Sequence, residues 1–302
     1  MAVIETEGLT RRFRRTDAVD GLTLQVPEGS VFALLGANGA GKTTTMKLLM
    51  NLLRPTRGRA RVLGCDSTAL GVGERQRIGY VSENQRLPGW MTAAELMTYC
   101  RPLYPSWDEP FARTLQSALG LTAPQRIAAM SRGTKMKAAL LASLAYRPEL
   151  VLLDEPFTGL DPVVRDELVR ALLQSCAEHT ATVFISSHDI DEVERLADWV
   201  GFIERGKLLF AEPTASLLSR FRLVEVIGET AAPAPPTDPR WLVQGVSGRT
   251  LRMIDTAHDR PDAREQIAAA FPATEVRTSP LSLRDIFVAL ARRAHTSEVE
   301  AV

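Results

Sequence analysis

The residues best suited to chemistry form a glycine-rich loop near the start of the chain. The loop follows the pattern Gly, four residues, Gly, Lys, Thr, and spans residues 36–44. Glycines let backbone N–H groups close around phosphate oxygens, because no Cβ blocks the approach. Lys42 can reach the terminal phosphates, and the Thr43 hydroxyl can bind Mg²⁺. The candidate nucleotide-binding residues of the loop are Gly36, Asn38, Gly39, Ala40, Gly41, Lys42, Thr43 and Thr44.

A second set of candidates follows two apolar runs, at 150–153 and 182–185. Asp154 and Glu155 come directly after the first run, and His188 comes shortly after the second. Ligands of open α/β sheets bind at the carboxyl ends of the strands. Asp154 can therefore hold Mg²⁺, and Glu155 can polarise a water in line with the terminal phosphate.

The elements that position these residues can be predicted from the same patterns. An apolar strand at 31–35 and a helix at 44–50 flank the loop, which favours a phosphate site over a chance glycine-rich turn. Residues 92–145 are mostly helical in pattern and indicate an inserted helical region, with a capping box at Thr92 and Glu95. Further strands are expected at 59–63 and 78–81, a helix at 162–178, and a hairpin around 205–207.

The first 30 residues predict strands at 3–9 and 22–26, with a turn at 20–21 and a basic loop at 11–15. The aromatic ring of Phe13 in this loop suits stacking on a nucleotide base. On these residues alone, a solvated basic turn with a locally packed Phe13 is the favoured interpretation.

Composition narrows the class of protein. The 302 residues suffice for one large and one smaller domain. Lys plus Arg and Asp plus Glu number 36 each, so zero net charge gives no support for extensive nucleic-acid binding. No apolar run reaches membrane-spanning length, and the three widely spaced cysteines predict reduced thiols in a cytosolic protein.

The C-terminal part changes in composition and predicts a small α+β appendix without a catalytic constellation. A Pro/Ala-rich stretch at 229–239 indicates an exposed loop. The expected strands and helices around it are strands 221–227, 241–246 and 250–254, and helices 261–271 and 283–294.

Residues 3–213 resemble an ATP-binding cassette (ABC) ATPase through features that occur in the order of that family. They are the glycine-rich loop, the helical insertion, the segment Met-Ser-Arg-Gly-Thr at 130–134, the acidic strand end continued through 159–161, and His188. The resemblance implies an α/β fold: a P-loop NTPase core of ABC type with an antiparallel β subdomain and an inserted helical subdomain, followed by the small C-terminal α+β appendix. The expected domains are 1–215, with the helical subdomain at about 84–146, and 216–302.

The resemblance also implies roles for individual residues. Two cassettes pair head to tail, and each ATP lies between the loop of one chain and the signature segment of the other. Lys42, Glu155 and His188 would then be catalytic, with Glu155 as the base and His188 sensing the γ-phosphate. Mg²⁺ would be bound by Thr43, Asp154 and Glu83. The remaining ATP contacts implied by the resemblance are Phe13, which falls at the adenine-stacking aromatic, Ser131 and Gly133 of the signature, and Asp161, which communicates across the interface.

Two positions depart from the family pattern. Glu83 stands where the family usually has Gln, and it places an additional carboxylate beside the phosphates. The signature segment carries Arg132 and Thr134, so only Ser131 and Gly133 match the family's Leu-Ser-Gly-Gly-Gln. We expect altered Mg²⁺ dependence or turnover from Glu83, while the role of Arg132 stays open between a phosphate-side charge and a surface contact.

Similar cassettes that serve separate membrane permeases, many of them exporters, carry a C-terminal helix like the one at 281–290. The resemblance therefore implies an ATPase subunit of an ABC-2-like exporter. It would be a homodimer or pair with a related cassette, and would lie in the cytoplasm at the inner face of the cell membrane, bound to an integral-membrane permease. The alternatives are a soluble cassette acting on ribosomes or nucleic acid and a binding-only regulatory cassette.

Overall fold

The computed structural model describes residues 1–83, 85–179, 181–272 and 274–299. The chain divides into two units, Met1–Ala211 and Glu212–Val302, which are described separately. Asn84, at which the expected helical subdomain begins, and residues 300–302 lie outside the described residues.

A six-stranded sheet forms the centre of the first unit, with strand order β10-β9-β3-β8-β7-β6. Strands β6, β7, β8, β3 and β9 are neighbours in this order, and each pair of neighbours is parallel. Every residue of β3, β7 and β8 is buried, as expected for parallel strands covered on both faces. The strands are β3 (Val31–Leu35), β6 (Ile78–Ser82), β7 (Leu150–Asp154), β8 (Thr182–Ser187), β9 (Trp199–Glu204) and β10 (Lys207–Pro213). The predicted hairpin around 205–207 is confirmed by the neighbouring strands β9 and β10.

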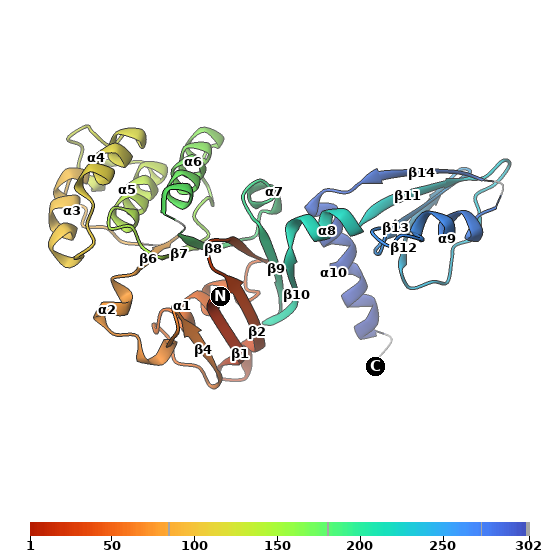
Figure 1. Cartoon of the computed structure of the whole chain (residues 1–302), viewed down its shortest axis with the longest axis horizontal. Coiled ribbons are helices and arrows are strands. Elements are labelled where there is room, and N and C mark those ends of the chain that lie inside the picture. Colours follow the sequence, from red (N-terminus) through yellow and green to blue (C-terminus); the bar gives the residue numbers. More distant parts are fainter. Residues whose placement is uncertain (84, 180, 273, 300–302) are drawn as a thin grey trace. The chain divides into compact units, whose positions relative to one another are not determined.

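An antiparallel sheet of order β2-β1-β4-β5 lies beside the central sheet in the same unit (Figure 1). Helix α1 (Lys42–Leu49) contacts strands of both sheets, and its buried Met46, Leu48 and Leu49 join the core that the two sheets share. The strands are β1 (Ala2–Phe13), β2 (Thr16–Pro27), β4 (Arg57–Val62) and β5 (Cys65–Asp66). The helix that follows the phosphate loop is thereby fixed from two sides.

Two local predictions for this sheet are wrong. The expected basic loop at 11–15 is mostly strand, because β1 continues to Phe13 and only Arg14 and Arg15 form the turn. The expected turn at 20–21 lies inside β2, where a register shift opposite β1 and a φ of 65° at Gly21 mark a bulge. Pairing along both strands outweighs the local turn signal at that glycine.

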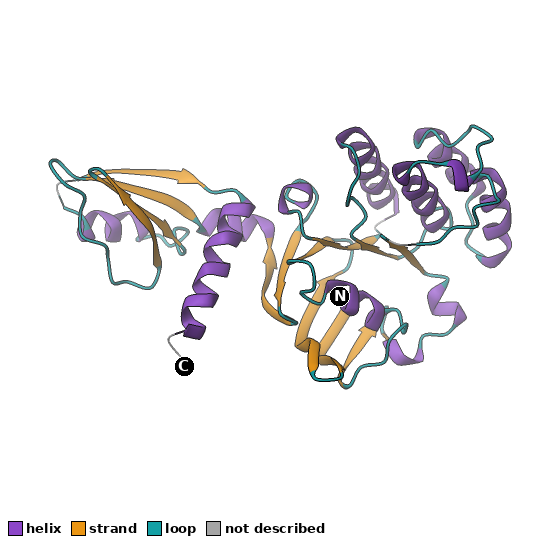
Figure 2. Cartoon of the chain, turned by 180° about the vertical axis from the view of Figure 1, so that it is seen from behind, coloured by secondary structure: helices purple, strands orange, loops and turns teal. Residues whose placement is uncertain are grey.

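The helical insertion consists mainly of α3, α4 and α5, and Thr92 and Glu95 form the expected capping box. Figures 1 and 2 show these helices grouped with α6 on one side of the central sheet, with the antiparallel sheet on the other. The helices of the unit are α1, α2 (Val72–Arg75), α3 (Ala93–Cys100), α4 (Glu109–Ala118), α5 (Arg132–Leu144), α6 (Pro162–His179) and α7 (Ile190–Val193). The expected helix at 162–178 is confirmed by α6.

The second unit holds an antiparallel sheet of order β12-β13-β11-β14, and its core includes Val224, Leu251, Met253, Ile267 and Phe271. Three of its strands and the helices α9 and α10 agree with the sequence predictions, whereas α8 and β14 were not predicted. The elements are α8 (Thr214–Arg220), β11 (Arg222–Ile227), β12 (Trp241–Ser247), β13 (Thr250–Asp255), α9 (Ala263–Ala270), β14 (Glu275–Pro280) and α10 (Leu283–Val299).

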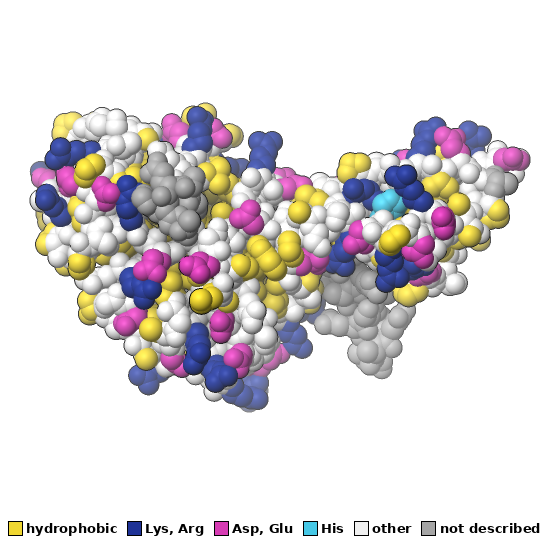
Figure 3. All heavy atoms as spheres, in the orientation of Figure 1, with side chains coloured by type: hydrophobic (Ala, Val, Ile, Leu, Met, Phe, Trp, Pro, Cys, Tyr) yellow, Lys and Arg dark blue, Asp and Glu magenta, His cyan; other side chains and the backbone are white. Residues whose placement is uncertain are grey.

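On the face shown in Figure 3, Lys and Arg side chains are interspersed with Asp and Glu side chains, and neither sign covers a large area. In the part of the chain that the structure describes, no helix combines the length and apolarity needed to cross a membrane. Cys65 and Cys100 are free thiols, and burial raises the pKa of Cys100.

Candidate nucleotide-binding site

The glycine-rich loop connects the end of β3 to the start of α1, and two of its glycines have no room for a side chain. A Cβ on Gly36 would lie 2.3 Å from the backbone oxygen of Ile203. A Cβ on Gly41 would lie 2.4 Å from the backbone oxygen of Ala18, and its φ of 114° is itself unfavourable for other residues. The loop is thus packed closely against the backbone of β9 and β2.

A cavity of about 170 Å³ opens beside this loop. It brings together predicted residues from three separate segments: the loop, the end of β6 and the end of β7. Its lining residues are Ala18, Asn38, Gly39, Gly41, Lys42, Thr43, Thr44, Glu83 and Glu155. Ala18, in β2, is the one lining residue that the sequence analysis did not name.

Asp154 is held at the end of β7 by two hydroxyl groups. Thr43 Oγ1 donates to Asp154 Oδ1 at 2.9 Å, and Ser186 Oγ donates to the same oxygen at 2.8 Å. Burial raises the pKa of Asp154, and the hydrogen bonds from Ser186 and Thr43 act in the lowering direction. Sequence reasoning missed Ser186, although parallel pairing places it directly opposite Asp154.

Glu155 lies at the centre of the site and is 8% exposed. One carboxylate oxygen is 3.0 Å from Lys42 Nζ, and the other is 2.7 Å from His188 Nδ1. Thr158 Oγ1 also donates to the second oxygen at 3.1 Å. The backbone of Glu155 has a φ of 52°, a strained value for a side chain of this size, which is often found where function demands it. The three predicted catalytic residues, Lys42, Glu155 and His188, therefore form one connected group.

The residues at the cavity suit Mg²⁺ bound together with a nucleotide. The Thr43 hydroxyl and the Asp154 carboxylate supply neighbouring oxygen atoms, the donor type that Mg²⁺ prefers. Among the described residues, no three His, Cys, Asp or Glu side chains are arranged to hold a metal by themselves. That is expected for Mg²⁺, which usually takes one or two protein ligands and completes its shell with phosphate oxygens and water. When bound, the ion would neutralise part of the phosphate charge.

The signature residues lie apart from this cavity. Ser131 is exposed and caps α5, where its hydroxyl accepts from the Thr134 N–H at 3.1 Å. Gly133 is buried in the first turn, where an added Cβ would lie 3.1 Å from Val164. Neither residue lines the cavity of its own chain.

Asp161 and Phe13 also lie outside the lining of the cavity. The Asp161 carboxylate caps α6 by accepting from the N–H groups of Val163 and Val164, both at 3.1 Å. Phe13 is 41% exposed at the end of β1, and the Arg11 guanidinium lies 4.6 Å from the centroid of its ring.

Glu83, the first departure from the family pattern, lines the cavity. Its N–H donates to the backbone oxygen of Asp154 at 2.9 Å, which fixes it one residue beyond β6. Its carboxylate accepts from Arg132 at 2.9 Å, so the two departures contact each other, and this expected Mg²⁺ ligand is paired with a cation in the structure.

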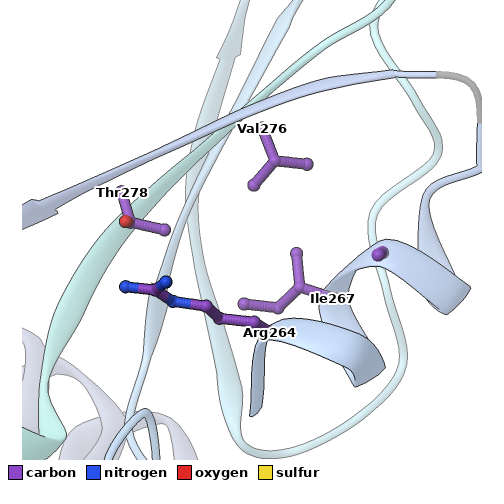
Figure 4. Close-up of a pocket in the computed structure, with 5 residues that line it drawn as sticks. Arg264, Ile267, Val276 and Thr278 are labelled. Atoms are coloured by element: carbon purple, nitrogen blue, oxygen red, sulfur yellow. The ribbon is translucent and has the colours of Figure 1, made fainter. Parts of the chain in front are cut away.

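A second cavity, of about 360 Å³, lies in the C-terminal unit between α9 and β14 (Figure 4). Its lining residues are Arg264, Ile267, Ala268, Val276 and Thr278. Arg264 is the charged side chain in this lining.

Comparison with known proteins places this geometry in a family. A family model described as ABC transporter matches residues 19–158. The bacitracin transport ATP-binding protein BcrA of Enterococcus faecalis is 30% identical over 292 residues, covering 94% of this chain and 95% of that protein. The daunorubicin/doxorubicin resistance ATP-binding protein DrrA of Streptomyces peucetius is 36% identical over 224 residues, covering 72% and 67%.

A solved structure shows the same fold. A dimeric ATP-binding cassette in a post-hydrolysis state, bound to ADP and Pi, aligns with a TM-score of 0.63 at 21% identity, covering 70% of this chain and 98% of that one. The expected fold class and the family resemblance are both confirmed. Members of this family bind and hydrolyse ATP, generally with Mg²⁺, and work with membrane proteins. The chain belongs to the ABC transporter family, as one of its ATP-binding proteins.

Proposed function

We propose that this chain hydrolyses Mg·ATP and thereby powers export through a separate membrane permease. The observation that carries the proposal is the connected group of Lys42, Glu155 and His188 beside the phosphate loop. A buried carboxylate between a lysine and an imidazole, at the mouth of a phosphate-binding loop, is suited to phosphoryl transfer to water.

Each side chain then has a task that its contacts support. Glu155 accepts a proton from the attacking water, and His188 holds the Glu155 carboxylate through Nδ1 while its remaining ring nitrogen stays available to the γ-phosphate. Lys42 exchanges its present bonds to the Gly36 and Ala37 carbonyls for phosphate oxygens. Thr43 and Asp154 hold Mg²⁺, and the exposed ring of Phe13 stacks on the adenine.

A second cassette completes the site in this proposal. Ser131 and Gly133 lie at the start of α5, whose exposed N-terminal end suits an anion but does not line its own chain's cavity. They are therefore offered to the ATP of another copy or of a related chain, with Asp161 in the same interface. The dimeric arrangement of the similar solved cassette supports this pairing.

Export through a permease rests on the relatives. Two of them are named for bacitracin transport and for daunorubicin/doxorubicin resistance. The chain would therefore act in the cytoplasm, bound at the inner face of the membrane through the permease. A cassette acting on ribosomes or nucleic acid is the alternative, and the balanced charge of 36 basic and 36 acidic residues does not favour it.

The test is the variant Glu155→Gln, with Glu149→Gln as the matched control at the other end of β7. We expect Glu155→Gln to lower kcat by about 10²- to 10⁴-fold while ATP binding is retained, because only the general base is lost. Glu149→Gln should hydrolyse ATP at the wild-type rate. Equal turnover of Glu155→Gln and wild type would remove Glu155 from the base role.

The same variant tests the partner. Held with ATP, it should be recovered from native membranes in mild detergent together with an integral membrane protein. Recovery with ribosomes or nucleic acid, and without a membrane protein, would contradict the transport role and leave the ATPase assignment standing.

A further inference from the structure

Two residues that depart from the family pattern meet at the edge of the nucleotide cavity. Arg132 Nη2 donates to Glu83 Oε1 at 2.9 Å, with side-chain exposures of 51% and 34%. Residues 83 and 132 are far apart in sequence and belong to different elements, the end of β6 and the start of α5. The pairing is therefore a product of the tertiary fold.

The position of Arg132 is unfavourable for its own helix. Arg132 is the first residue of α5, and the first turn of this helix contains no acidic residue. A positive charge near a helix N-terminus opposes the helix dipole. Helix stability therefore does not explain an arginine here, and its partner outside the helix does.

The guanidinium also packs against the turn that follows β7. A Cβ on Gly159 would lie 3.0 Å from Arg132 Nη1 and 3.3 Å from its Cζ. Gly159 has a φ of 70°, so the turn presents its bare backbone to the arginine. Arg132 thus contacts both the end of β6 and the turn leading to Asp161.

The Glu83–Arg132 ion pair affects the charge balance at the nucleotide cavity. The lining contains two carboxylates, Glu83 and Glu155, and Lys42 as its basic side chain. Glu155 is already paired with Lys42, so Glu83 would add uncompensated negative charge beside a polyanionic ligand. Arg132 is the cation placed to offset it.

We propose that Arg132 is a positioning residue that neutralises Glu83 and holds its carboxylate away from the phosphates, so that the two residues act as one unit in nucleotide binding. This proposal rests on the ATP-binding role given above. It gives Arg132 a role at the edge of the cavity of its own chain, through Glu83.

A double-mutant cycle in the full-length protein tests whether Glu83 and Arg132 act together. The measured quantity is the affinity for Mg·ATPγS, determined by calorimetry. Arg132→Gln should weaken binding about tenfold, because it leaves the Glu83 carboxylate unpaired beside the phosphates. In the Glu83→Gln background, the same Arg132→Gln change should alter affinity by less than about threefold, because the carboxylate that it would leave unpaired is absent. Arg132→Lys retains the positive charge and should keep most of the wild-type affinity. This variant also tests the proposal if Arg132→Gln folds poorly.

Ionic strength separates electrostatics from structure. The defect of Arg132→Gln should shrink severalfold at high salt, because screening weakens repulsion between a partly exposed carboxylate and the ligand. The matched control is Arg77→Gln, which breaks a similarly exposed ion pair with Glu149 at the opposite ends of β6 and β7. It should leave nucleotide affinity and its salt dependence unchanged.

The outcomes are distinct. If wild type binds Mg·ATPγS but Glu83→Gln does not rescue Arg132→Gln, Arg132 acts on the nucleotide by another route and the proposed unit is wrong. Tighter binding by Arg132→Gln would overturn it as well, since Glu83 would then serve as a ligand that Arg132 occupies. Failure of wild type to bind would overturn the ATP-binding role and this inference together.

Discussion

Replacing Ser186 by alanine tests how the buried end of β7 is prepared for Mg²⁺. The Ser186 hydroxyl donates to Asp154 Oδ1 at 2.8 Å and accepts from the Glu155 N–H at 3.1 Å. Ser186 is fully buried, so water cannot take the place of the lost hydroxyl. The Glu155 N–H keeps its hydrogen bond to the Ser186 backbone oxygen at 3.2 Å. The main effect of the substitution is therefore that Asp154 loses one of its hydrogen-bond donors.

The size of the effect follows from the charge of the acceptor. A hydrogen bond to a charged group contributes about 1.5–3 kcal/mol, and loss of a group that orients a metal ligand costs about 10- to 100-fold in metal affinity. We therefore expect Ser186→Ala to need about 10- to 100-fold more Mg²⁺ for half-maximal ATP hydrolysis.

The stability loss caused by Ser186→Ala should also depend on pH. Burial already raises the pKa of Asp154 in the folded protein, and removal of a lowering hydrogen bond raises it further. A group with a raised pKa stabilises the fold below its unfolded pKa, and this contribution disappears as pH rises through the folded pKa. The stability deficit of Ser186→Ala should therefore be larger at neutral pH than in acid, where Asp154 is protonated.

The assay is ATP turnover against Mg²⁺ concentration, together with urea unfolding at acidic and neutral pH. The control is Ser143→Ala, which removes a buried hydroxyl that donates to the Tyr80 carbonyl at 3.2 Å, away from Asp154. An unchanged Mg²⁺ requirement in Ser186→Ala, with a stability loss no larger than that of Ser143→Ala, would refute the reasoning.

Three further substitutions separate binding from folding. Lys42→Ala should abolish the rise in melting temperature that ATP produces, because the buried cation of the loop is lost; a wild-type shift would contradict its phosphate role. Gly36→Ala should destabilise the fold by about 1–3 kcal/mol and impair ATP binding, since its Cβ would lie 2.3 Å from the Ile203 oxygen. A free energy of unfolding equal to that of wild type would show that the loop can move to make room for the Cβ. Tyr146→Phe should cost about 1–2 kcal/mol in urea unfolding by removing the buried hydrogen bond to the Ile78 carbonyl at 2.9 Å, and a changed KM for ATP would contradict a purely structural role.

Chemistry carried by neighbouring residues could be predicted from the sequence. The loop pattern around Lys42 and the two acids after the apolar run at 150–153 each lie within one short segment, so type and spacing suffice to identify them. The core strands β3, β7 and β8 were equally accessible, because fully buried parallel strands appear as continuous apolar runs.

Elements without such a pattern were missed or misjudged. Strand β14 has Val276 as its one large apolar residue, and it forms because β11 offers an open edge for backbone pairing. Gly21 carries a strong turn signal, yet β2 continues through it as a bulge. The reason is that β1 pairs with the residues of β2 that precede and follow Gly21. In both cases long-range backbone hydrogen bonds outweigh local propensity.

The sequence by itself determined which residues could bind a nucleotide, because that chemistry is written in contiguous segments. The tertiary structure alone decided their partners: Ser186 with Asp154, Lys42 with Glu155, and Arg132 with Glu83. These partners lie 32 or more residues apart in the chain, and parallel strands and helix packing bring them to one edge of the sheet. Local spacing carries no information about such contacts, because they depend on register and on how the elements pack.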